Sequence, residues 1–186
     1  MTSQTTTGIG YSIDLSGELR LADLRRAAGP VAITVPDAVR ERIRRGREYL
    51  QRVLGEDRPV YGATTGFGAL VGYAGRADQA DQCDNTLAHL GAGHGPDIDP
   101  AVSRAAMLVR VWSLAQGASG VSPHVIDGLA AMLATSFVPA IPRLGSVGAS
   151  GDLIPLAYAT QALRGRGHAY LDGVRMPADQ ALRQAG

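Results

Sequence analysis

Residues 145–158 of the chain read GSVGASGDLIPLAY. Four of the first seven residues are glycine or alanine, and Asp152 then opens an apolar run that predicts a helix from Asp152 to Leu163. Residues this small permit backbone bends and close approaches that larger side chains exclude. The stretch is therefore either a tight structural connection into a helix or a chemical site.

Three common explanations of this stretch can be compared by the spacing of its residues. A plain connection needs only Asp152 as the helix N-cap. A phosphate-binding loop fits poorly, because the glycines follow Gly-x-x-Gly-x-x-Gly, no Lys-Ser/Thr pair is present, and the other glycine-rich stretch, GAGHG at 91–95, follows a helix and not a strand. A hydrolase nucleophile needs Gly-x-Ser-x-Gly, whereas Gly151 follows Ser150 directly.

A fourth explanation uses the backbone of Ala149-Ser150-Gly151 itself. The amide nitrogen of Gly151 can attack the carbonyl carbon of Ala149 if the chain bends enough to bring them together, which a residue without Cβ permits. Loss of water leaves an imidazolone ring, and loss of the Ser150 hydroxyl leaves an exocyclic methylidene group. The product is an electrophile that needs no added cofactor.

Three stretches together resemble one known family. The stretch GSVGASGDLIPLA at 145–157 closely resembles the signature of the aromatic amino acid ammonia-lyases and aminomutases, whose Ala-Ser-Gly tripeptide forms 4-methylideneimidazole-5-one (MIO). VYGATTGFG at 60–68 resembles the family's Tyr-Gly-x-x-Thr-Gly-Phe-Gly loop, and NTLAHLGAGHG at 85–95 resembles its substrate-pocket segment. The resemblance runs from about Ser12 to Gly186 and implies a mainly α fold, the MIO-bearing N-terminal part of the ammonia-lyase fold, with glycine-rich active-site loops.

The resemblance implies roles for several residues. Ala149, Ser150 and Gly151 would form MIO autocatalytically, and Tyr61 would be the base that removes the substrate's β-proton. Free tyrosine loses its proton only at about pH 10, so this role requires positive charge or hydrogen-bond donors around the phenol oxygen. We also expect the N-terminal amides of the helix that begins at Asp152 to stabilise charge on the imidazolone oxygen.

Substrate binding is expected at His89, Leu90 and Gly68. Tyrosine ammonia-lyases resemble this chain in their His-Leu pair, whereas phenylalanine enzymes tend to have an aromatic residue first and histidine enzymes Ser-His. An imidazole can hydrogen-bond a phenol, and a pocket built for that bond rejects the analogue without it. We therefore expect elimination of ammonia from L-tyrosine to give 4-coumarate. A tyrosine 2,3-aminomutase is the nearest alternative, and a non-catalytic or regulatory subunit is another.

Composition sets further expectations. With 45% apolar residues, a net charge of +1 and scattered arginines, the chain is not typical of a disordered, nucleic-acid-binding or membrane protein. No apolar run reaches membrane-span length and no signal-peptide core is present, so we expect a cytoplasmic protein. The single cysteine, Cys83, cannot form an internal disulfide, and we expect its thiol to be buried. For the chain as a whole we expect no metal and no nucleotide cofactor.

The remaining patterns predict the domain and its elements. Residues 1–10 are expected to be a flexible tail and 11–186 a single MIO-bearing domain. The helix predicted at 101–116 has Ala105, Leu108, Val109 and Trp112 on one side. Helices are predicted at 37–54, 77–90, 101–116 and 177–184, with another that opens on Ser122 as N-cap and Pro123, and a β-hairpin is predicted to turn at Asp172-Gly173.

Family members are much longer, and the remainder of their chain forms a helical bundle at a tetramer core and carries the arginine for the substrate carboxylate. We therefore expect a second polypeptide to supply this bundle, which gives a hetero-oligomer with a tetramer-like core. A cleaved or truncated chain and a degenerate protein are the alternatives to such a split enzyme.

Overall fold

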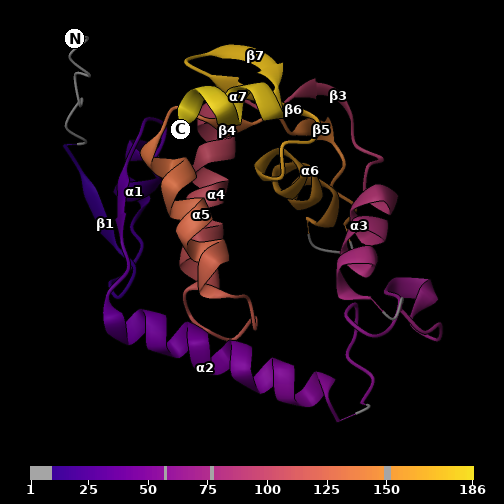
Figure 1. Cartoon of the computed structure of the whole chain (residues 1–186). Helices are drawn as coiled ribbons and strands as arrows, with labels where there is room; N and C mark the ends of the chain where they lie inside the picture. Colours follow the sequence, from indigo (N-terminus) through magenta and orange to yellow (C-terminus); the bar gives the residue numbers. More distant parts are fainter. Residues whose placement is uncertain (1–9, 57, 76–77, 149–151) are drawn as a thin grey trace.

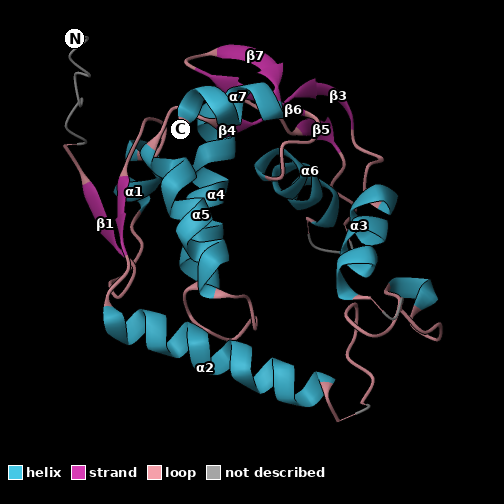
Figure 2. Ribbon diagram, viewed as in Figure 1, coloured by secondary structure: helices cyan, strands magenta, loops and turns pink. Residues whose placement is uncertain are grey.

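The structure is a computed structural model that describes residues 10–56, 58–75, 78–148 and 152–186. Its described elements confirm the mainly α class (Figure 2). In chain order they are β1 (Ser12–Asp14), α1 (Leu21–Arg26), β2 (Ala32–Thr34), α2 (Asp37–Leu54), a 3-10 turn (Gly68–Leu70), α3 (Gln79–His89), β3 (His94–Asp97), α4 (Pro100–Leu114), α5 (Pro123–Ala134), β4 (Val138–Pro139), β5 (Pro142–Leu144), α6 (Leu153–Leu163), β6 (His168–Leu171), β7 (Val174–Pro177) and α7 (Ala178–Ala185) (Figure 1). The predicted tail largely lies outside the described residues.

The helix pair α4 and α5 forms the centre of the core (Figure 1). The apolar side predicted for α4 is only partly its buried side, because Leu108 is buried but Val109 is 43% exposed and Trp112 only partly buried. The helix packs against α5 on one side and against α1 and β4 on the other, so its buried surface is wider than a single stripe. The buried apolar residues of α4 are Met107, Leu108, Val111 and Leu114.

Arg104 is buried in this core, 2% exposed, and its burial was not predicted. Its guanidinium donates to the carbonyl oxygens of Leu133 (2.7 Å), Ala27 and Thr135 (2.8 Å each), Gly29 (2.9 Å) and Phe137 (3.2 Å). These carbonyls lie at or just beyond the C-terminal ends of α1 and α5, where helices leave acceptors without intrahelical partners. Burial lowers the pKa of Arg104. Backbone carbonyl oxygens, and not a carboxylate, accept the hydrogen bonds of its guanidinium.

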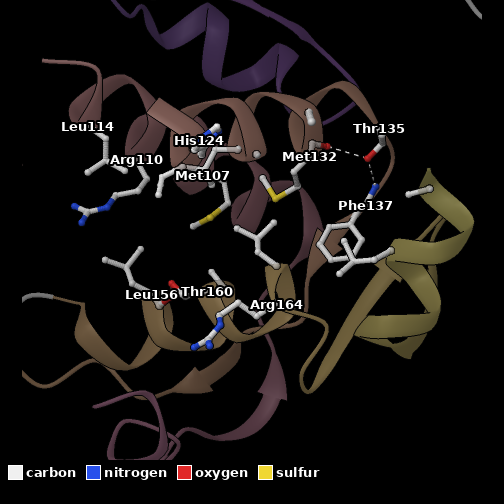
Figure 3. Close-up of a pocket in the computed structure, with 18 of the residues that line it drawn as sticks. Met107, Arg110, Leu114, His124, Met132, Thr135, Phe137, Leu156, Thr160 and Arg164 are labelled. Atoms are coloured by element: carbon white, nitrogen blue, oxygen red, sulfur yellow. Dashed lines mark hydrogen bonds between the residues drawn. The ribbon is translucent and has the colours of Figure 1, made fainter. Parts of the chain in front are cut away.

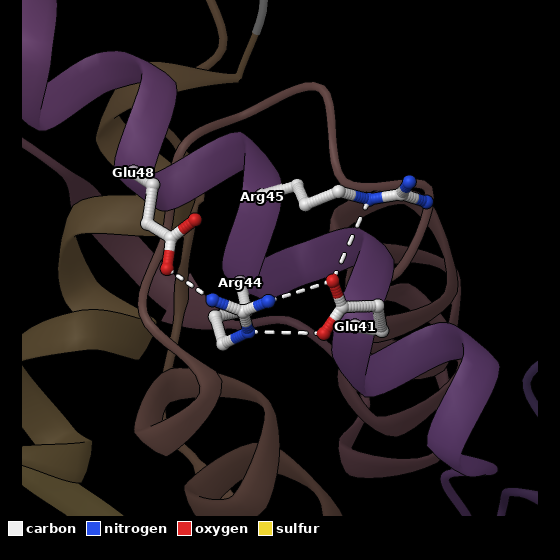
Figure 4. A network of polar contacts seen from close by, with 4 residues as sticks. All are labelled: Glu41, Arg44, Arg45 and Glu48. Carbon is white, nitrogen blue, oxygen red and sulfur yellow. Dashed lines mark hydrogen bonds and ion pairs between the residues drawn. The ribbon is translucent and has the colours of Figure 1, made fainter.

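The helix α2 has the predicted bounds, and charged side chains cover its exposed face. Arg44 lies between Glu41 and Glu48 and bonds both, and Arg45 also approaches Glu41 (Figure 4). On the other side α2 meets the α4–α5 connection, where Arg42 donates to the carbonyl of Ala115 at 2.8 and 3.0 Å. Each of the exposed ion pairs of Arg44 and Arg45 contributes only about a few tenths of a kcal/mol to the free energy of unfolding.

Strands add short ladders around the helices. The parallel pair β1–β2 aligns Ser12 with Ala32, β3 pairs antiparallel with β5, and β4, β6 and β7 form a three-stranded antiparallel sheet. The predicted hairpin is confirmed as β6–β7, and both Asp172 (φ 49°) and Gly173 (φ 79°) take the positive φ values that such a two-residue turn requires. The ladders β1–β2 and β3–β5 span three or four residues per strand, too few for alternation to reveal them.

The other predicted helices are present with shifted ends. Those predicted at 77–90, 101–116 and 177–184 run over Gln79–His89, Pro100–Leu114 and Ala178–Ala185. Pro123 begins α5 as predicted, although the Ser122 side chain makes no capping bond. Among the residues described, no helix combines the length and apolarity needed to cross a bilayer.

Candidate active site

The loop at 60–75 is closed by its own hydrogen bonds. The hydroxyl of Thr64 accepts from the N–H of Val60 (2.8 Å), and the N–H of Gly75 donates to the carbonyl of Thr64 (2.8 Å). A further bond joins the N–H of Gly66 to the carbonyl of Tyr73 (3.0 Å). These contacts bring the two ends of the loop together, and each of them includes a residue of the 60–68 stretch.

The structure brings Tyr61 and Gly68 together. The backbone N–H of Gly68 donates to the Tyr61 hydroxyl oxygen at 2.8 Å. Gly68 has a φ of +59°, which a residue with a side chain rarely adopts, so glycine suits the turn at this position. A donor aimed at a phenol oxygen stabilises that oxygen most when it carries negative charge. The contact is of the kind that a base at this position needs.

His89 lies across a hollow from the same loop. The hollow has a volume of about 300 Å³ and lies between α3 and the loop, where Phe67 and Tyr73 line it with His89. His89 is exposed and makes no hydrogen bond or ion pair with the described residues, so its imidazole can bind a ligand. Leu90 is the C-cap residue of α3 and does not line this hollow within the described part of the chain.

Two side chains of α6 and that of its C-cap residue, Arg164, hold the helix against α3 and the segment that follows α3. The Tyr158 hydroxyl lies 3.0 Å from the carbonyl oxygens of both Gly91 and Gly93 and donates to them. Gln161 donates to the carbonyl of Leu87 at 2.8 Å. One ion pair, between Arg164 and Asp84 at 2.5 Å, completes the link. The helix that follows the Ala-Ser-Gly tripeptide is thereby fixed relative to the helix that carries His89.

The tripeptide Ala149-Ser150-Gly151 lies outside the described residues, but its flanks are joined. The Ser146 hydroxyl donates to Asp152 Oδ1 at 2.5 Å, so the described residues on the two sides of the tripeptide are hydrogen-bonded to each other. Asp152 precedes α6 as its N-cap, yet its carboxylate makes no capping bond to the helix. Cyclisation of the tripeptide would require its two flanks to be held close together, so these flanks fit an MIO group.

One expectation about a side chain on these helices needs correction. Cys83 is exposed and not buried. The buried residues of α3 are Gln82 and Leu87, while the Cys83 thiol faces outward, with its Sγ 3.8 Å from an Arg164 nitrogen. The two contacts of the Tyr158 hydroxyl described above were not predicted, because its position in the sequence carries no signal for them. No set of three or more His, Cys, Asp or Glu side chains in the described ranges is placed to hold a metal ion.

The family assignment follows from comparison with known proteins. The model of the family described as "Aromatic amino acid lyase" matches residues 19–186 of this chain. The chain therefore belongs to the aromatic amino acid lyase family. A probable histidine ammonia-lyase of Halobacterium salinarum is 41% identical over an alignment of 185 residues that covers 97% of this chain and 34% of that protein.

Solved structures agree in fold. The phenylalanine aminomutase of Pantoea agglomerans superposes with a TM-score of 0.84 at 30% identity, over 95% of this chain and 34% of that one. The tyrosine aminomutase of Streptomyces globisporus gives a TM-score of 0.83 at 30% identity, over 93% and 33% of the two chains. The chain thus spans about a third of the length of the relatives it matches.

Proposed function

We propose that the chain is the MIO-bearing part of an aromatic amino acid ammonia-lyase that eliminates ammonia from L-tyrosine to give 4-coumarate. The observation that carries the proposal is the bond from the Gly68 N–H to the Tyr61 hydroxyl, in the loop that also lines the hollow beside His89. A candidate base and a candidate recognition residue thus belong to one loop-and-helix unit.

The chain's own residues would divide the chemistry as follows. Tyr61, as phenolate, takes the β-proton while the bond between Cα and nitrogen breaks and ammonia leaves. The N–H of Gly68 stabilises the phenolate and fixes its direction. His89 hydrogen-bonds the phenol of the substrate across the hollow. When formed from Ala149-Ser150-Gly151, MIO supplies the electrophile that turns the amine into a leaving group.

Two other substrates or outcomes have specific support. The 41% identical relative is named as a probable histidine ammonia-lyase, which favours L-histidine as the second candidate substrate. The matches at 30% identity to phenylalanine and tyrosine aminomutases favour an aminomutase that forms a β-amino acid. An exposed imidazole at position 89 can hydrogen-bond either a phenol or an imidazole substrate, so product analysis has to separate these candidates.

The experiment has two parts. First, the intact mass of the purified chain is compared with that of Ser150→Ala. A wild-type mass lower by two water molecules, and an unmodified variant, are expected if MIO forms. Second, the chain is combined with a complementary lyase polypeptide and given L-tyrosine, L-phenylalanine or L-histidine. Coumarate from L-tyrosine supports the proposal, whereas an unmodified mass and no elimination in any combination would support the non-catalytic subunit.

Loss of the Tyr61 hydroxyl tests its role as base within the same assay. Tyr61→Phe should lower kcat by about 10²-fold or more, as removal of an acid–base group does, while the modified mass persists. A change in KM alone would mean that Tyr61 only helps to hold the substrate.

A further inference from the structure

The face of α3 that lines the hollow beside His89 carries polar side chains. Gln82, Asn85, Thr86 and His89 all line this hollow. Residues at such positions, three, four and seven along from the first, form one continuous face of an α-helix. A helix that packs on the rest of a globular protein normally has apolar side chains on that face. The polar face of α3 is therefore suited to a ligand that forms hydrogen bonds.

The loop at 60–75 gives the hollow a wall of the opposite kind. Phe67, Leu70 and Tyr73 line it from this side, and Leu70 and Tyr73 are 47% and 69% exposed. Exposed apolar and aromatic side chains gathered in one place are typical of a binding surface. A flat ring with a polar atom at one edge fits between the two walls, because its face packs on the apolar wall while its polar edge meets α3.

A larger cavity elsewhere in the described chain is built differently. It has a volume of about 660 Å³, lies between α4, α5, α6 and α7, and is lined mostly by apolar side chains (Figure 3). The threonine hydroxyls in its lining are used within the chain, since Thr135 donates to the carbonyl of Met132 (2.9 Å) and Thr160 to that of Leu156 (2.8 Å). The smaller hollow beside His89 is thus the better match for a ring with a polar edge.

Asn85 and His89 lie one helical turn apart on the polar face. Neither side chain makes a hydrogen bond or ion pair with the described residues. Side chains four residues apart on a helix have Cβ atoms about 5–6 Å from each other, and a hydrogen bond spans about 3 Å, so one ligand atom placed between the two is within reach of both. The Asn85 carboxamide offers N–H donors, and a neutral His89 imidazole offers one nitrogen as acceptor.

We propose that Asn85 is a second specificity-determining residue of the hollow and acts together with His89 on one substrate atom. Its carboxamide N–H donates to the oxygen of a hydroxyl group on the substrate's ring, and the same hydroxyl donates to the imidazole of His89. A phenol satisfies both side chains because it accepts and donates at a single oxygen, whereas an ether oxygen only accepts and an unsubstituted ring does neither. The hollow therefore takes hydroxylated aromatic amino acids, and the inference rests on the proposed function for the choice of L-tyrosine.

The test measures the binding of three ring fragments to the full chain by NMR titration, without reference to activity. The fragments are 4-methylphenol, which accepts and donates, 4-methylanisole, which only accepts, and toluene, which does neither. Asn85→Leu should weaken binding of both oxygen-bearing fragments at least about threefold, the effect of one lost hydrogen bond, and leave toluene unchanged. His89→Phe should weaken binding of 4-methylphenol alone. Ala88→Leu, an exposed site on α3 that does not line the hollow within the described residues, is the matched control.

Circular dichroism checks that each variant is folded, and Asn85→Ala, which only shortens the side chain, should repeat the pattern of Asn85→Leu. The proposal is overturned if the wild-type chain binds none of the fragments, if Asn85→Leu behaves as Ala88→Leu does, or if it weakens toluene as much as 4-methylphenol. Tighter binding of 4-methylimidazole than of 4-methylphenol would overturn the choice of a hydroxyl.

The two proposals fail in different ways. The expected fragment pattern in a chain that eliminates no ammonia in any assembly would keep the role of Asn85 and remove the proposed function. Elimination of ammonia from L-tyrosine with no effect of Asn85→Leu on the fragments would do the reverse.

Discussion

The Tyr158 hydroxyl oxygen lies 3.0 Å from the carbonyl oxygen of Gly93. This one contact joins α6, the helix that follows residues 149–151, to the segment that follows α3. The Tyr158 ring approaches this segment so closely that a Cβ added at Gly93 would lie 2.7 Å from the ring. The glycine therefore permits the ring to reach the backbone that it bonds.

The first prediction is that Tyr158→Phe weakens this junction without disturbing its packing. The variant keeps the ring and removes the donor shared by Gly91 and Gly93, so the free energy of unfolding should fall by about 1 kcal/mol. Amide hydrogen exchange at residues 91–95 should become faster. Tyr49→Phe is the control, because Tyr49 is 59% exposed on α2 and its hydroxyl makes no hydrogen bond to the described residues. Its effect should stay within about 0.5 kcal/mol. Equal effects of the two variants would contradict the assigned role.

A second prediction concerns two helical glycines that should respond in opposite ways to alanine. A Cβ at Gly46 in α2 would lie 2.0 Å from the carbonyl oxygen of Gly117, so Gly46→Ala must move α2 and should cost about 1–3 kcal/mol. At Gly128 in α5 the same change meets open space and should stabilise the chain by up to about 1 kcal/mol through helix propensity. Denaturant unfolding of both variants measures the difference. Stabilisation by both would show that α2 does not approach Gly117 this closely.

Removal of the buried guanidinium is the third prediction. Arg104→Met keeps a long side chain but leaves the carbonyls of helices α1 and α5 without their donor, so the free energy of unfolding should fall by about 3 kcal/mol or more. Arg45→Met, with its side chain 68% exposed, should change it by less than about 0.5 kcal/mol. Similar values for both would mean that Arg104 is solvated in solution.

These residues illustrate what the sequence could and could not predict. Long helices, the hairpin turn and the signature loops follow from local patterns, because periodicity and turn residues act over a few positions. The burial of Arg104 depends on carbonyls from residues 27–29 and 133–137, which only the folded chain brings together. Cys83 was predicted to be buried because free cysteines usually are, but the side of α3 that packs against the protein is not the side that carries Cys83. The sequence places Tyr61 and Gly68 in one motif but does not predict the hydrogen bond between them, because residue type does not determine the direction of an N–H group.

The fourth prediction is a dependence of stability on pH at Asp97. Burial alone would raise the pKa of Asp97, but hydrogen bonds from Arg175 (2.7 Å) and Tyr170 (2.8 Å) outweigh it and hold the pKa below its usual range. A carboxyl whose pKa is lowered by folding stabilises the folded state above its unfolded pKa of about 3.9 and loses that contribution as pH falls through the folded value. Asp97→Asn should therefore be less stable than wild type at pH 7, and the gap should narrow below about pH 4. Thermal unfolding between pH 7 and pH 2.5 measures the gap. A gap that does not change with pH would mean that the contacts to Arg175 and Tyr170 do not depend on charge.

The last prediction concerns substrate choice at His89. If its imidazole bonds the phenol of L-tyrosine across the hollow, His89→Phe removes that bond and adds apolar surface. The ratio of kcat/KM for tyrosine to that for phenylalanine should then fall at least about tenfold, because a pocket discriminates by the polar groups left unpaired. The measurement uses the chain in its active assembly, with both amino acids as substrates. His94→Phe is the matched control, since His94 is also exposed but does not line the hollow within the described residues.

The pattern of outcomes separates the candidates. A fall in the ratio for His89→Phe but not for His94→Phe supports tyrosine recognition by His89. An unchanged ratio in both variants would place His89 outside the substrate pocket. If L-histidine is the better substrate of the wild-type assembly and its kcat/KM alone falls in His89→Phe, the same imidazole recognises an imidazole in place of a phenol. That result would favour the activity named for the 41% identical relative over the one proposed here.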